Sequence, residues 1–86
     1  MTSLLEILTN ENDVVAYIKR CERNIELFEE DIKRVERIDI ECEAKSRDIA
    51  RWKDLIEEER WRIVIAERKL DDIRAELRDY LKELMN

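Results

Sequence analysis

Apolar residues recur at every seventh position along almost the whole chain. The series starts at residue 7 and continues without a gap to residue 84. Its members are Ile7, Val14, Cys21, Phe28, Val35, Cys42, Ile49, Ile56, Ile63, Leu70, Leu77 and Leu84. An unbroken seven-residue repeat is typical of helices that pack along a shared seam, as in a coiled coil. The pattern therefore predicts an all-α protein.

The second apolar position of each repeat changes its spacing along the chain. In the first half it comes four residues after the repeat position, at Ile18, Ile25 and Ile32. In the second half it comes three residues after, at Trp52, Ala66, Ile73 and Tyr80. The phase of the repeat therefore slips between about residues 39 and 49. Such a slip fits either one long helix with locally altered winding or a turn between two helices.

The lengths of the two halves favour the turn. A turn near residues 43–46 leaves helices over about 12–43 and 46–85, which can pack antiparallel. Ser46 followed by Asp48 has the character of a helix N-cap with an acid in the first turn. The absence of glycine and the spacing of Glu41 and Lys45 support one continuous helix instead. The hairpin predicts a longest dimension of roughly 60–70 Å, against about 105 Å for a single helix.

The first residues of the chain predict a short additional helix over about 3–9. Good capping residues follow it at Thr9, Asn10 and Asn12, and these separate it from the next helix. Its apolar residues are expected to cover the end of the second long helix, which would otherwise overhang. The predicted fold is one domain over residues 1–86: an antiparallel, coiled-coil-like helical hairpin with a short N-terminal helix, which dimerises into a four-helix bundle.

Composition and charge narrow the expected partners. Charged residues make up 47% of the chain, and the net charge is −6. Neither half is basic, so non-specific binding to nucleic acid has no electrostatic driving force. The chain shows no signal peptide and no apolar run of the roughly 20 residues that span a bilayer. We therefore expect a cytoplasmic protein, with Cys21 and Cys42 reduced and buried on the seam.

The residues that usually carry chemistry are scarce. The chain has no histidine and no glycine, which removes the commonest general base and every glycine-rich phosphate loop. Clusters of glutamate along the helices are more typical of solvated faces than of metal sites. We therefore expect no enzyme activity, no cofactor and no metal. Two charged residues, Asp39 and Glu59, fall on the seam. Asp39 lies beside the predicted turn, where solvent reaches it, and for Glu59 we expect an ion pair with Lys33 or Arg34 that fixes the register.

A second apolar surface lies outside the seam. Within "RWRIVIAER", Trp61, Val64 and Ile65 are spaced three and four residues apart, so they share one outward face of the second helix. With the turn near residues 44 and 45, Leu27 lies level with residue 62 on the other helix. The four residues are predicted to form a protein interface, because a tryptophan within an apolar patch ringed by arginine and glutamate has the composition of an interaction hot spot. Burial of this patch under a folded-back N-terminal helix is the alternative.

These patterns favour a non-enzymatic protein-protein interaction module. A small acidic helical hairpin would bind a second copy of itself as a homodimer, another protein, or both. The alternative is a phage-type inhibitor that occludes a host enzyme acting on nucleic acid, as an anti-defence protein or a nucleic-acid mimic. No motif in the chain identifies a family.

Overall fold

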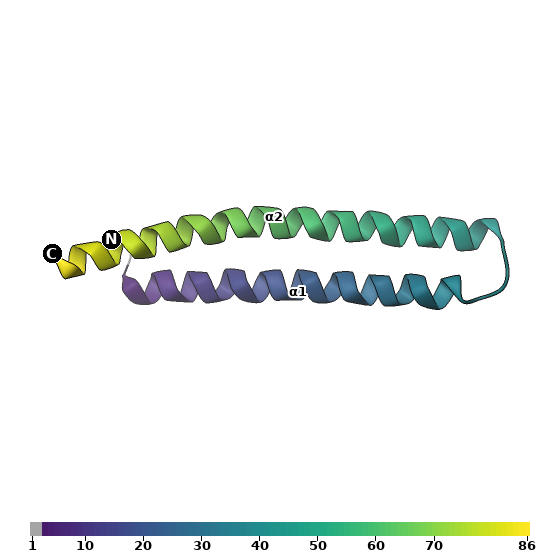
Figure 1. The fold of residues 1–86 in the computed structure, drawn as a ribbon, viewed down its shortest axis with the longest axis horizontal. Helices are drawn as coiled ribbons and strands as arrows, with labels where there is room; N and C mark the ends of the chain where they lie inside the picture. The colour runs from purple at the N-terminus through teal and green to yellow at the C-terminus, as the bar shows by residue number, and fades with distance from the viewer. Residues whose placement is uncertain (1–2) are drawn as a thin grey trace.

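The protein forms two antiparallel helices joined by a short loop. The computed structural model describes residues 3–86, with α1 at Leu4–Glu36, α2 at Glu43–Met85 and the loop over residues 37–42 (Figure 1). The described chain measures 67 × 16 × 15 Å. This length agrees with the 60–70 Å expected of a hairpin, and the prediction of an all-helical hairpin is confirmed.

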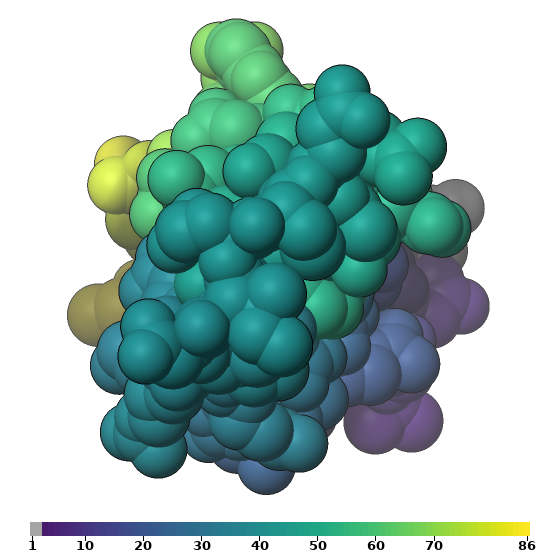
Figure 2. All heavy atoms as spheres, turned by 90° about the vertical axis from the view of Figure 1, so that its right-hand side faces the viewer, coloured from purple at the N-terminus to yellow at the C-terminus, as the bar shows by residue number. Residues whose placement is uncertain are grey.

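The predicted seam holds the two helices together. Most of the buried residues belong to the apolar series or to its second position. Ile18 of α1 packs with Ala66 and Leu70 of α2, and Val14, Val15 and Ile63 pack against this cluster. Viewed from the loop end in Figure 2, side chains of α2 lie above those of α1. Because the hairpin is only two helices thick, each helix keeps more than half of its circumference outside the seam.

The prediction of a separate N-terminal helix over residues 3–9 is wrong. α1 runs without interruption through Thr9, Asn10 and Asn12. A continuous helix keeps its backbone hydrogen bonds there and places Ile7, which is 1% exposed, on the seam. The true N-cap is Ser3, whose hydroxyl accepts a hydrogen bond from the backbone N–H of Glu6 at 3.2 Å. The order Ser-x-x-Glu is the sequence signature of a capping box.

The turn lies several residues earlier than predicted. α1 ends at Glu36 rather than near residue 43, and α2 starts at Glu43 rather than at 46. Cys42 is the N-cap of α2, and its sulfur accepts a hydrogen bond from the backbone N–H of Lys45 at 3.4 Å. The Nζ atom of Lys45 donates to the carbonyl of Ile38 at 2.8 Å, which ties the loop to the new helix. Cys42 is exposed, so the expectation that both thiols are buried on the seam holds only for Cys21.

Candidate functional site

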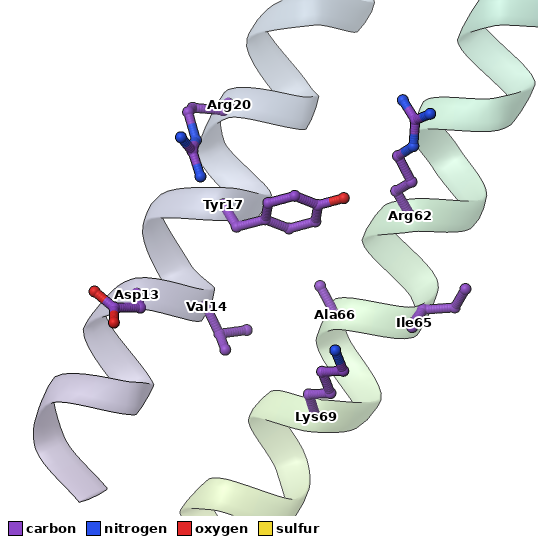
Figure 3. A pocket seen from close by; sticks show the side chains of 8 residues that line it. All are labelled: Asp13, Val14, Tyr17, Arg20, Arg62, Ile65, Ala66 and Lys69. Carbon is purple, nitrogen blue, oxygen red and sulfur yellow. The ribbon is translucent and has the colours of Figure 1, made fainter. Parts of the chain in front are cut away.

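A hollow opens along one side of the hairpin, between α1 and α2. Its volume is about 350 Å³. We call it the Tyr17 groove; its lining residues are Asp13, Val14, Tyr17, Arg20, Arg62, Ile65, Ala66 and Lys69. In Figure 3 the ring of Tyr17 extends from α1 toward α2, and Val14 and Ala66 face one another across the floor. The floor of the hollow includes Ala66, a small buried residue on the seam.

The rim of the Tyr17 groove is cationic although the chain as a whole is acidic. Arg20, Arg62 and Lys69 stand around it with a single acid, Asp13. The guanidinium carbon of Arg20 lies 5.8 Å from the centre of the Tyr17 ring, a cation-π arrangement that holds both side chains at the rim. The groove therefore combines an apolar floor, an aromatic wall and positive charge, a combination that suits an apolar side chain flanked by acidic residues.

A buried carboxylate lies near the groove, within the seam. Glu59 is only 6% exposed, and its Oε1 accepts a hydrogen bond from Arg62 of its own helix. Its Oε2 is buried and has no hydrogen-bond partner among the described residues. The bond to Glu59 raises the pKa of Arg62. Burial raises the pKa of the Cys21 thiol, and the neighbouring Glu59 carboxylate raises it further. Burial, and then Cys21, raise the pKa of the Tyr17 hydroxyl.

The expected ion pair between Glu59 and Lys33 or Arg34 does not form. Glu59 bonds to Arg62 instead, and the α1 residue beside it is Cys21. Arg34 pairs with Asp31 of its own helix at 3.7 Å. The physical reason is the earlier turn, which moves α1 relative to α2 by more than a helical turn from the predicted register. An ion pair that does join the helices connects Arg74 to Glu11 at 3.3 Å, near the open end.

Three of the four predicted interface residues lie together. Trp61 is 64% exposed, Ile65 is 53% exposed and Val64 is 37% exposed, all on the outer side of α2. Ile65 also lines the Tyr17 groove, so the apolar patch and the groove form one surface. Leu27 is exposed as well, but it does not lie level with Arg62 as predicted. Arg62 shares the groove with Tyr17 and Arg20, and Leu27 follows Arg20 by seven residues, about 10 Å nearer the loop.

The sequence reading missed Tyr17 and the lining residues of α1. Tyr17 falls three residues after Val14 and four before Cys21, so it borders the seam without belonging to either apolar position. This spacing, together with Arg20 one turn later, places Tyr17 and Arg20 on the same side of α1. Their role can be recognised only when the alignment of the two helices is known, because that alignment puts this side of α1 next to Ile65 of α2.

Within residues 3–86, no three His, Cys, Asp or Glu side chains gather in a way that suits a metal ion. Nor does either helix, over this range, have a stretch long and apolar enough to cross a membrane. Comparisons of the chain with protein families, curated proteins and solved structures found no match.

Proposed function

We propose that this protein is a non-enzymatic interaction module that binds protein through one continuous surface. The surface consists of Trp61, Val64 and Ile65 on α2 together with the Tyr17 groove beside them. The observation that carries the proposal is the exposure of Trp61 and Ile65 next to an apolar hollow, in a hairpin that already has a separate buried seam. The first partner that we propose is a second copy of the chain.

The energetics agree with a binding role. Burying a large apolar side chain stabilises a complex by roughly 1.5–3 kcal/mol before the cost of association is subtracted. Three such residues and a tyrosine in one patch are enough for a measurable complex, and a tryptophan beside arginine is typical of interface hot spots. Leu27 lies outside this surface and is not part of the proposed interface.

The substitution Trp61→Glu tests the proposal. It should abolish association while leaving the helix content unchanged, because Trp61 is exposed and touches neither the seam nor a cap. Sedimentation velocity measures the mass, and circular dichroism on the same sample measures the helix content. Leu84→Glu is the matched control: Leu84 lies on the same helix and is as exposed as Trp61, at 64%, but it is about 34 Å away along the helix, so its replacement should leave association intact.

Two results would count against self-association through this surface. If the wild-type protein sediments as a monomer at tens of micromolar, the patch serves another partner, and the inhibitor of a nucleic-acid-handling enzyme becomes the better explanation. If the wild type associates and Trp61→Glu associates equally well, the contact lies elsewhere on the hairpin.

A further inference from the structure

The outer face of α2 carries a symmetric arrangement of charges. Six residues follow one another at spacings of seven, four, three, four and seven, so they share one side of the helix. They are Arg51, Glu58, Arg62, Ile65, Lys69 and Glu76. The spacings read the same in both directions, with their centre between residues 63 and 64. Ile65 and Arg62 line the Tyr17 groove, so this row of residues runs along its edge.

Four of the charges along this row are opposite in sign to the charge at the mirrored position, whereas Asp54 and Asp72 beside the row are alike in charge. Arg51 and Glu76 are equally far from the centre and opposite in charge, and so are Glu58 and Lys69. All four side chains belong to exposed residues. Within residues 3–86, none of the four takes part in an ion pair. A second α2 laid antiparallel on this face would supply each of them with an opposite charge, whereas a parallel α2 in register would place like charges together.

We infer that a second copy of this chain docks antiparallel along α2, with its two-fold axis beside residues 63 and 64. This inference rests on the proposed function and names the partner and its orientation. In this arrangement Arg51 pairs with Glu76 of the second copy, Glu58 pairs with Lys69, and the same pairs repeat by symmetry. The paired row spans about 38 Å of helix.

The same register brings the apolar patch of each copy to the interface. A two-fold axis beside residues 63 and 64 keeps corresponding side chains on the same flank, so Trp61 of both copies lies on the flank of the row that faces away from α1. There Trp61 of one copy lies beside Ile65 of the other, and the contact repeats by symmetry. The Tyr17 grooves of the two copies lie on the flank toward α1 and face one another across the same axis.

A charge exchange tests the pairing of Glu58 with Lys69. Glu58→Lys and Lys69→Glu alone should each weaken the dimer about tenfold, because each replaces two opposite-charge contacts by two like-charge contacts. The double variant carries the original net charge and restores the pairs in reverse, so its Kd should return to within about threefold of the wild-type value. Glu67→Lys, which changes the net charge equally on the other side of α2, should leave the Kd unchanged.

Spin labels test the orientation without altering the interface. Cys42 is exposed and Cys21 is buried, so Cys42 can be labelled selectively in the native chain. In the antiparallel dimer the two Cys42 labels lie about 65 Å apart, and in a parallel dimer they lie within about 30 Å. Double electron–electron resonance measures this distance directly.

The outcomes separate the two proposals. Rescue by the double variant together with the long distance supports the antiparallel docking. A dimer that depends on Trp61 but shows no rescue, or a short distance between labels, overturns the docking and leaves the interaction surface in place. A protein whose association is indifferent to Trp61→Glu overturns both.

Discussion

The hairpin has a hollow on each side of its seam, and the two hollows differ in kind. The Tyr17 groove has a volume of about 350 Å³, and the hollow on the opposite side, which we call the Arg74 groove, about 460 Å³. The lining of the Arg74 groove is Val15, Ile18, Lys19, Glu22, Glu67, Leu70, Asp71 and Arg74. Size therefore does not distinguish a binding surface from the ordinary flank of a two-helix protein.

The two grooves differ in the balance of positive and negative residues on their rims. The rim of the Arg74 groove carries acids and bases in nearly equal number, and Arg74 already bridges the two helices by its ion pair with Glu11. The rim of the Tyr17 groove carries three cations and one acid. The exposed Trp61 directly precedes Arg62 of this rim in the sequence. A flank whose charges are nearly balanced suits solvent, while a flank with an excess of one sign beside apolar surface suits a partner.

The largest effect is expected from the seam that both grooves share. Leu70→Ala should lower the free energy of unfolding by roughly 2–5 kcal/mol, because it removes a buried side chain and leaves a cavity beside Ile18 and Ala66. Urea denaturation measures the change. Leu84→Ala is the control on the same sevenfold series: Leu84 is 64% exposed, so its loss should cost less than about 0.5 kcal/mol. Equal losses at both positions would mean that the series is not the core.

The second largest effect on stability is expected at the buried carboxylate of Glu59. Replacing Glu59 by leucine should raise the free energy of unfolding by about 1–3 kcal/mol, because an unpaired buried carboxylate oxygen is exchanged for apolar contact with the seam. Chemical denaturation of the two proteins side by side tests this expectation. A destabilised Glu59→Leu would show that the bond from Arg62 to Glu59 holds the Tyr17 groove together more strongly than the unpaired oxygen weakens it.

The smallest effect concerns pH. The pKa of Cys21 is raised in the folded protein, chiefly by burial. As pH rises above the ordinary thiol pKa of about 8.5, the unfolded chain loses this proton and the folded chain keeps it, so the free energy of unfolding should fall. Cys21→Ala should flatten this decline above about pH 8.5, and urea denaturation at a series of pH values measures it. An identical slope in the wild type and the variant would contradict the assignment of Cys21.

The seam could be predicted because the repeat continues through twelve positions and requires no knowledge of the partner helix. The register could not be predicted as well, because it depends on where the loop begins. The alternation of apolar and polar residues in "IDIEC" indicated that residues 38–42 are unfavourable for a helix. The capping residue Ser46, however, suggested that the second helix starts later than it does. The structure caps α2 with the thiol of Cys42, which is not among the side chains preferred at that position.

The shift in register accounts for the errors at the site. Trp61, Val64 and Ile65 were identified correctly as an outward face because their spacing lies within one helix. Leu27 was placed with them through a contact between helices, and that placement was lost when the loop moved toward the N-terminus. Tyr17 could be recognised as a groove residue only from the alignment of the two helices, because the groove forms between Tyr17 on α1 and Ile65 and Ala66 on α2.

The asymmetry between the two grooves is tested most directly by one pair of variants. Ile65→Lys and Glu67→Lys place the same side chain two residues apart on α2, at exposed positions on opposite flanks. Sedimentation equilibrium on the wild type and both variants measures their association. We predict that Ile65→Lys is monomeric at concentrations where the wild type and Glu67→Lys remain associated, with equal helix content in all three. Equal association of the two variants would contradict a binding surface on the Tyr17 side.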